Sequence, residues 1–166
     1  NKGLLPKDVK LNKPGSIIKS ILKVYEIYQS KTKDLNAFDF GDLILFCVKL
    51  FEENKDIREI YQKNFKYILV DEFQDTNYIQ NKWLNLLVNE SENICCVGDD
   101  DQSIYSWRGA EIKNFLTFDK IYKNCKVFKL EQNYRSTKNI LDTASVLISN
   151  NSNRVGKKLW SSANQG

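Results

Sequence analysis

The chain has 166 residues, 42% of them hydrophobic and 28% charged, so it can bury a core and is not a disordered protein. No apolar run approaches the roughly 18–20 residues that cross a bilayer, and no secretory leader is recognisable, so we expect no membrane segment. Four cysteines without C-x-x-C spacing, and no histidine, disfavour common zinc sites and Ser-His or Cys-His catalysis. These features are typical of a reduced, cytoplasmic protein.

The net charge of +4 is unevenly distributed. Residues 1–34 carry eight lysines against three acidic residues, so the remainder of the chain is close to neutral. A basic lobe suits a polyanionic partner, although lysine-rich surfaces are commonly only solvated faces. The chain begins at Asn1 and contains no methionine, so we expect it to be an internal piece of a longer protein.

Two helices are predicted in the first third of the chain. Apolar residues at helical spacing follow Pro14-Gly15-Ser16 up to about Gln29. A second helix is expected to start near Asp39, because Asp39 and Asp42 have the spacing of a capping pair. Its predicted apolar face consists of Leu43, Phe46, Cys47 and Leu50.

The rest of the chain alternates short apolar runs with amphipathic stretches. The expected strands are buried and cover residues 67–70, 94–97 and 126–130. The expected helices begin at Thr76 as N-cap, near 111–118, and at 136–149. This alternation predicts an α/β fold with a mainly parallel sheet covered by helices. Residues 154–166 are expected to form a loose polar tail.

Two of the expected strands end in acidic residues. Val70 is followed by Asp71 and Glu72, and Val97-Gly98 is followed by residues 99–101, all aspartates. Ligands of open parallel sheets bind beyond the carboxyl ends of the strands. An aspartate there can hold Mg²⁺, and an adjacent glutamate can deprotonate an attacking water. The pattern is that of the metal-and-base corner of a nucleotide triphosphatase, although acidic residues also begin many ordinary loops.

Longer strings around these acids are more specific. Ile68–Asn77 reads Ile-Leu-Val-Asp-Glu-Phe-Gln-Asp-Thr-Asn, and Val97–Ala110 reads Val-Gly-Asp-Asp-Asp-Gln-Ser-Ile-Tyr-Ser-Trp-Arg-Gly-Ala. Leu130–Asn139 reads Leu-Glu-Gln-Asn-Tyr-Arg-Ser-Thr-Lys-Asn, and Phe38–Ile44 reads Phe-Asp-Phe-Gly-Asp-Leu-Ile. The first three resemble motifs II, III and IV of superfamily 1 DNA helicases of the UvrD/PcrA/Rep type, in that order, and the fourth resembles the segment ahead of motif II.

The resemblance implies a RecA-like fold, of the P-loop NTPase type, in which two such domains clamp ATP and move along single-stranded DNA. By similarity, Asp71 would help hold Mg²⁺, and Glu72 would be the general base for water attack on the γ-phosphate. Gln102 would contact that phosphate. Arg135 would be an arginine finger from the second domain, a role worth roughly 10³–10⁵ in rate. Outside the motif, Arg135 would be read as an ordinary surface charge.

Three further roles follow from the same resemblance. Trp107 would stack on a DNA base, a contact worth about 1–3 kcal/mol and tolerant of sequence, whereas without the motif it would be read as a core aromatic. Arg108 would bridge the ATP and DNA sites, and Tyr134 would pack near the nucleotide base or sugar. The expected partners are single-stranded and duplex DNA, with a role in repair or replication.

The resemblance also divides the chain. Residues 1–15 would end the accessory 1B insertion, residues 16–128 would form the C-terminal half of domain 1A, and residues 129–166 would begin domain 2A. The sheet would then be incomplete because the chain is truncated. No G-x-x-x-x-G-K-[ST] phosphate-binding loop occurs in the sequence, so we expect these residues alone neither to hydrolyse ATP nor to unwind DNA.

Three alternatives remain open. A helicase–nuclease subunit of the RecB/AddA kind shares the motif II and III patterns. A two-metal nuclease would use Asp71, Glu72, Asp99 and Asp101, but gives no use to Gln102, Trp107 or Arg135. A non-catalytic single-strand DNA-binding module would combine the basic lobe with Trp107 and bind in a salt-sensitive, nucleotide-independent way.

Overall fold

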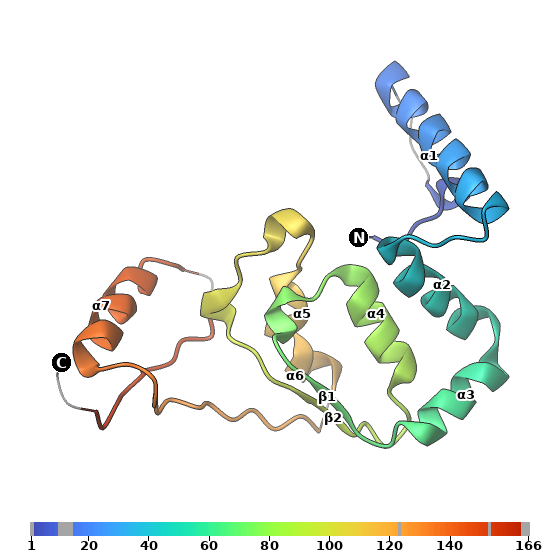
Figure 1. Ribbon diagram of the computed structural model, residues 1–166. Coiled ribbons are helices and arrows are strands. Elements are labelled where there is room, and N and C mark those ends of the chain that lie inside the picture. Colours follow the sequence, from blue (N-terminus) through green and yellow to red (C-terminus); the bar gives the residue numbers. More distant parts are fainter. Residues whose placement is uncertain (1, 10–14, 123, 153, 164–166) are drawn as a thin grey trace.

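The computed structural model describes residues 2–9, 15–122, 124–152 and 154–163 (Figure 1). Its helices are α1 (Ser16–Asp34), α2 (Phe40–Glu53), α3 (Lys55–Asn64), α4 (Tyr78–Leu87), α5 (Ile112–Leu116), α6 (Phe118–Ile121) and α7 (Lys138–Ile148). The strands are β1 (Ile68–Val70) and β2 (Ile94–Cys96). Single turns of 3-10 helix are η1 (Pro6–Asp8), η2 (Phe73–Asp75), η3 (Asp100–Gln102) and η4 (Ser106–Arg108). The protein is therefore a mixed helix and strand structure, as predicted.

The start of α2 confirms the capping pair expected at Asp39. The Asp42 backbone N–H donates to Asp39 Oδ1 at 2.7 Å, and the Asp39 N–H donates to Asp42 Oδ2 at 3.2 Å. Asp42 is only 3% exposed, and Gln29 Nε2 of α1 donates to its Oδ1 at 2.9 Å. Because Tyr28 also donates from its hydroxyl to Asp39, at 2.9 Å, the end of α1 is fixed to the first turn of α2.

The buried face of α2 differs from the predicted one. Leu43, Phe46, Cys47 and Leu50 are exposed, whereas Leu45, Val48 and Phe51 are buried. Residues two positions apart in sequence are separated by about 200° around the helix axis, so the predicted and the buried residues lie on different sides of α2. Both sides of this helix are apolar. Packing against α3 and α4 decides which side is covered. The main core combines these α2 side chains with Ile79, Leu84 and Leu87 of α4.

The strands β1 and β2 form a parallel pair, connected through α4. Ile68 lies opposite Ile94, and Val70 lies opposite Cys96. A strand–helix–strand unit of this kind confirms the predicted parallel pairing. The expectation of fully buried strands is wrong, because Leu69 is 81% exposed and one face of the pair is uncovered among the described residues.

The third predicted strand is not formed. Residues 126–130 are extended but pair with no strand of the described chain, and Figure 1 shows them as a long segment leading from α6 to α7. Val127, Phe128 and Leu130 are 65%, 80% and 81% exposed. A β-prone sequence becomes a strand only when a neighbour accepts and donates its ladder hydrogen bonds, and none is placed there.

Three smaller differences concern helix boundaries. The N-cap of α4 is Asn77, whose side chain accepts from the Gln80 N–H, not Thr76. The helix expected near 111–118 is divided at Thr117 into α5 and α6, and α3 was not predicted. The last helix, α7, is capped at Thr137 and lies within the predicted range.

The C-terminal segment is tied down rather than loose, as far as its described residues 154–163 show. Trp160 N–H donates to Glu131 O at 3.0 Å, and Asn133 N–H donates to Trp160 O at 2.8 Å, so the segment runs parallel to the chain ahead of α7. The predicted tail at 164–166 lies outside the described residues. None of the helices that the structure describes is long and apolar enough to cross a membrane.

Candidate functional site

The loops that follow β1 and β2 meet at one edge of the strand pair. Val97 N–H donates to Val70 O at 2.8 Å, and Phe73 N–H donates to Val97 O at 3.0 Å. These bonds continue the pairing past the strand ends, so Asp71 and Glu72 lie beside the loop that begins at Gly98. The two acidic runs predicted from the sequence therefore share the carboxyl edge of the sheet, where ligands of parallel sheets bind.

A sharp turn carries the first pair of acids. Glu72 has a left-handed backbone (φ 50°, ψ 42°), which costs a residue other than glycine about 1–3 kcal/mol. Asp71 Oδ1 accepts from the Glu72 N–H at 2.9 Å and supports this turn. Both residues are exposed, so both carboxylates are accessible at the edge.

Gln74 connects the two loops. Its side chain is 1% exposed, with Nε2 donating to Glu72 Oε2 at 2.6 Å and Oε1 accepting from the Asp99 N–H at 3.0 Å. Gly98 makes room for this amide, because a Cβ at residue 98 would lie 2.6 Å from Gln74 Oε1. Gln74 is a site residue that was not predicted from the sequence. Its position in the Asp-Glu-Phe-Gln string, as an amide among acids, is the one signal that pointed to it.

The second loop places Gln102 beside Asp99. Gln102 Nε2 donates to Asp99 Oδ2 at 2.7 Å, and the Asp101 N–H donates to Asp99 Oδ1 at 3.0 Å. Burial alone would raise the pKa of Asp99, but hydrogen bonds from Lys157 and Gln102 outweigh it and hold the pKa below its usual range. Asp99 is therefore an anion that orients Gln102. A chain of hydrogen bonds runs from Glu72 through Gln74 and the Asp99 residue to Gln102.

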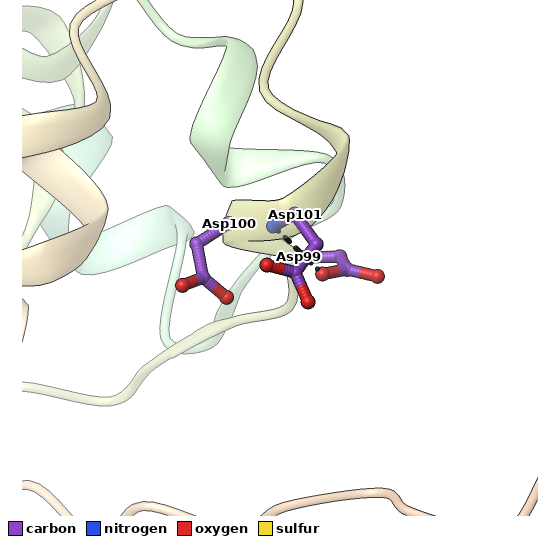
Figure 2. A group of neighbouring side chains, drawn as sticks. All are labelled: Asp99, Asp100 and Asp101. Atoms are coloured by element: carbon purple, nitrogen blue, oxygen red, sulfur yellow. Dashed lines mark hydrogen bonds between the residues drawn. The ribbon is translucent and has the colours of Figure 1, made fainter. Parts of the chain in front are cut away.

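One carboxylate oxygen from each of the three aspartates of this loop lies within 4.8 Å of the other two, and Figure 2 shows the three residues on one short turn. Their carboxylates already have partners in the C-terminal segment. Lys157 pairs with Asp99, Arg154 Nε donates to Asp101 Oδ1 at 2.8 Å, and the Val155 N–H donates to Asp100 Oδ2 at 2.6 Å. The carboxylates of Asp99 and Asp101 are thus each paired with a cation of the chain, which weighs against a two-metal nuclease built on them.

Beyond Gln102 the same loop carries a cluster of exposed side chains, Tyr105, Trp107 and Arg108. Trp107 is 78% exposed, and its ring centroid lies 6.4 Å from that of Tyr105. The Arg108 guanidinium lies 5.5 Å from the Tyr105 centroid and 5.7 Å from the Trp107 centroid. Trp107 is therefore not a core aromatic within the described structure. An exposed indole beside a cation can stack on a nucleic acid base.

Tyr134 and Arg135 lie in the segment ahead of α7, apart from this edge. Tyr134 is 84% exposed and donates to Gln132 Oε1 at 2.8 Å, and the Arg135 N–H donates to Asn133 Oδ1 at 2.9 Å. No hydrogen bond or ion pair within the described chain joins either residue to Asp71, Glu72 or Gln102. Asp71, Glu72 and Gln102 thus lie on the loops that meet at one sheet edge, and Trp107 and Arg108 lie side by side. Tyr134 and Arg135 are separate from both groups.

The donor set at the edge fits a hard divalent cation such as Mg²⁺. Asp71 presents an exposed carboxylate at the carboxyl end of a parallel strand, with Oδ1 accepting one backbone bond and no described side chain pairing with Oδ2. Mg²⁺ takes one or two protein carboxylates together with water and phosphate oxygens. Asp71 is therefore placed to supply one such carboxylate.

Comparison with known proteins identifies the family. The family model of the UvrD/REP helicase N-terminal domain matches residues 1–123. The chain belongs to the UvrD/REP helicase family. It is 48% identical over its whole length to a probable DNA helicase II homolog of Rickettsia conorii, of which it covers 26%. It is 50% identical over 86% of its length to the ATP-dependent DNA helicase PcrA of Bacillus subtilis, of which it covers 19%.

The matched UvrD/REP relatives are much longer than this chain. The ATP-dependent DNA helicase PcrA of Leuconostoc citreum is 45% identical over the whole chain, which spans 22% of that protein. The chain thus spans a fifth to a quarter of the curated relatives that it matches. The resemblance read from motifs II, III and IV is confirmed at the level of the family.

Proposed function

We propose that the chain is part of an ATP-dependent DNA helicase that couples hydrolysis of Mg-ATP to 3′-to-5′ movement on single-stranded DNA and to duplex unwinding, in repair or replication. The observation that carries the proposal is the hydrogen-bonded connection from Glu72 through Gln74 and Asp99 to Gln102. It places a base candidate and an amide donor on one sheet edge. The names of the Bacillus and Leuconostoc relatives, ATP-dependent DNA helicases, support the same function.

The two carboxylates that follow β1, Asp71 and Glu72, would have different roles. Asp71 would hold Mg²⁺, which when bound supplies positive charge to the phosphates. Glu72 would orient the attacking water and accept its proton, for which it needs a fixed and ionised carboxylate. Gln74 restrains that carboxylate through Oε2 and leaves Glu72 Oε1 without a described donor, so this oxygen would be the one to accept the proton of the water. Restraint of this kind lowers the cost of reaching a reactive geometry.

Gln102 would contact the γ-phosphate from the β2 loop. An amide NH₂ has two donors, so Gln102 can keep its bond to Asp99 and still donate to a phosphate oxygen. The same loop continues to Trp107, the proposed stacking residue for DNA. Loss of the γ-phosphate on hydrolysis would remove the contact at Gln102. Because Trp107 lies only five residues further along the same loop, a movement of Gln102 would also move the residue that contacts DNA. Arg108, against Trp107 and Tyr105, would take part in this coupling.

Tyr134 and Arg135 would act from a second RecA-like domain. We propose that residues 16–128 belong to the first such domain, after the end of a 1B insertion at 1–15, and that residues 129–166 begin the second. Separation of Arg135 from the sheet edge is what an arginine finger requires, because it reaches the phosphates only when domains close around ATP. Its side chain forms no ion pair with the described residues, so it is available for that contact.

The sequence contains no G-x-x-x-x-G-K-[ST] loop to cradle the phosphates. We therefore expect residues 1–166 alone to show no ATP turnover, and appreciable turnover by them would contradict the proposal. The single-strand binding module remains a competitor that gives Trp107 a use but none to Glu72. A RecB/AddA-like parent would carry a distant nuclease domain, and cleavage of DNA by the full-length protein would distinguish it.

The test is strand displacement by the full-length protein. Duplexes with a single-stranded 3′ tail are expected to be unwound when ATP and Mg²⁺ are present, and matched duplexes with a 5′ tail are not. Replacing ATP by a non-hydrolysable analogue should stop unwinding while leaving DNA binding intact. Unwinding without hydrolysable ATP, or equal unwinding of both substrates, would contradict the coupling or the direction, respectively.

A further inference from the structure

The C-terminal segment lies across the loop that carries Gln102. Arg154 and Lys157 each form an ion pair with an aspartate of that loop, and the Val155 N–H donates to the third. In Figure 1 the segment returns from α7 toward the loop after β2. Three contacts within four residues make this a defined attachment rather than a chance charge pair.

Lys157 and Gln102 share one carboxylate. Lys157 Nζ pairs with Asp99 Oδ1, and Gln102 Nε2 donates to Asp99 Oδ2 at 2.7 Å. The side chains of Lys157 and Asp99 are only 20% and 22% exposed, so water screens their charges incompletely. Lys157 therefore compensates the charge of the carboxylate that holds Gln102 and, together with the Asp101 N–H, fixes its orientation.

We propose that Lys157 is a positioning residue for Gln102, acting through Asp99, and thereby makes ATP turnover depend on the attachment of the C-terminal segment. This rests on the proposed role of Gln102 as the γ-phosphate contact. Without Lys157, the Asp99 carboxylate loses the ion pair on Oδ1, so the Gln102 amide bonded to Oδ2 is no longer held in the orientation in which its second N–H donates to the phosphate.

Arg154 fixes the segment that presents Lys157. Its guanidinium forms two hydrogen bonds to the Asp101 carboxylate, and the pair is 20% and 12% exposed. A bidentate bond of this kind fixes orientation as well as proximity. Movement of the segment with α7 would therefore be transmitted to the Gln102 loop.

The test is a double-mutant cycle on ATP hydrolysis by the full-length protein at saturating single-stranded DNA. Lys157→Met is expected to lower kcat/KM for ATP about tenfold, within the usual range for residues in one network. The neighbouring Lys158→Met is the matched control, because Lys158 is exposed and its side chain has no ion pair with a described residue. It should change kcat/KM by less than about twofold.

The decisive comparison is made in a Gln102→Ala background. There Lys157→Met should add less than about twofold, because the group through which it acts is gone. A full tenfold further loss would overturn the proposal, and so would a Lys157→Met protein with wild-type kinetics. Lys157→Arg keeps the charge and should retain at least about half of kcat/KM; a loss as large as that of Lys157→Met would also overturn the proposal.

The same measurements distinguish failure of the proposed function from failure of the positioning role of Lys157. If Gln102→Ala hydrolyses ATP like the wild type, the assignment of Gln102 is wrong whatever Lys157 does. If Gln102→Ala is impaired and the Lys157 effect is independent of it, the helicase proposal stands and only the positioning role fails.

Discussion

The Gln74 side chain donates from Nε2 to the Glu72 carboxylate at 2.6 Å, from a position almost fully shielded from solvent. A buried amide bonded to an exposed acid fixes the acid more firmly than solvent could. The other end of the same amide accepts from the backbone of Asp99, so the loops after β1 and β2 are held in one register. The proposed catalytic edge therefore depends on an uncharged and almost fully buried residue.

Replacing Gln74 by leucine tests that dependence. The variant leaves Glu72 without its donor and the Asp99 N–H without its acceptor, which costs about 1–3 kcal/mol of stability if the group stays buried. In the full-length protein we expect kcat for ATP to fall about tenfold or more, because the base is no longer restrained. Steady-state hydrolysis and thermal unfolding are measured together.

Gln62→Leu is the matched control for Gln74→Leu. Gln62 is half-buried and donates from Nε2 to Leu86 O at 2.8 Å and Val88 O at 3.2 Å, well away from the carboxyl edge of the strands. Its loss should lower stability comparably while leaving kcat of the folded protein near wild type. Equal kcat losses in both variants would show that Gln74 is only structural.

Gly98→Ala is predicted to displace the Gln74 side chain, and so to disturb its bonds to Glu72 and Asp99, from the loop that follows β2. The added Cβ would lie 2.6 Å from Gln74 Oε1 and 2.9 Å from the Phe115 ring, so both neighbours must move. Overpacking of this kind costs about 1–3 kcal/mol, and displacement of Gln74 should lower ATP turnover as well. Gly15→Ser is the control, since nothing lies within 4 Å of a Cβ there and serine suits an N-cap. A neutral Gly98→Ala would contradict the packing described.

The predicted and observed folds agree where contacts between residues close in sequence determine the structure. Asp39 and Asp42 fix the start of α2 through bonds three residues apart, so the sequence alone was sufficient. The buried face of α2 and the state of residues 126–130 depend on which other elements lie alongside. Periodicity does not specify that, so those predictions were wrong.

The same distinction holds at the candidate site. Asp71, Glu72 and Gln102 were predicted because their motifs are contiguous strings. Arg154 and Lys157 were assigned to a loose tail, and their pairing with aspartates more than fifty residues away could not be read from spacing. A pair of cations three residues apart, opposite a run of three acids, was the only available signal.

Trp107→Ala is expected to weaken single-stranded DNA binding without weakening the fold. Its side chain is 78% exposed, so little packing is lost, whereas one stacked base is worth about 1–3 kcal/mol, or roughly 5- to 150-fold in Kd. Tyr67→Ala is the control, because Tyr67 is 73% exposed but precedes β1 at the opposite end of the strand. The measurement is fluorescence anisotropy with a labelled oligonucleotide at fixed salt. Unchanged affinity in Trp107→Ala would remove the DNA role of that residue.

The cap at Asp39 should make stability depend on pH. Its pKa is lowered from 3.8, mainly by the Asp42 backbone N–H and then by the Tyr28 hydroxyl. The stabilisation is therefore fully present above the unfolded pKa and is lost as pH falls through the lowered folded pKa. Asp39→Ala is expected to cost about 1 kcal/mol near neutral pH, and the difference from wild type should shrink on acidification.

Asp39→Asn separates the cap from its charge. Asparagine can still accept from the Asp42 N–H, so this variant should keep most of the stability and show no acid-dependent loss from residue 39. Urea unfolding curves for wild type, Asp39→Ala and Asp39→Asn, at several pH values down to about 3, make the comparison. A difference between wild type and Asp39→Ala that grows on acidification would have the wrong sign for a depressed carboxyl pKa.

The most direct measurement is ATP hydrolysis by the full-length protein, with and without single-stranded DNA, for wild type, Glu72→Gln and the control Glu53→Gln. Glu53 is an exposed residue at the end of α2, remote from the carboxyl edge in sequence and in contacts. We predict DNA-stimulated hydrolysis in wild type and Glu53→Gln, and its loss by at least about a hundredfold in Glu72→Gln, with nucleotide binding retained. Hydrolysis indifferent to DNA and unchanged in Glu72→Gln would contradict the assignment of this sheet edge as the ATP site.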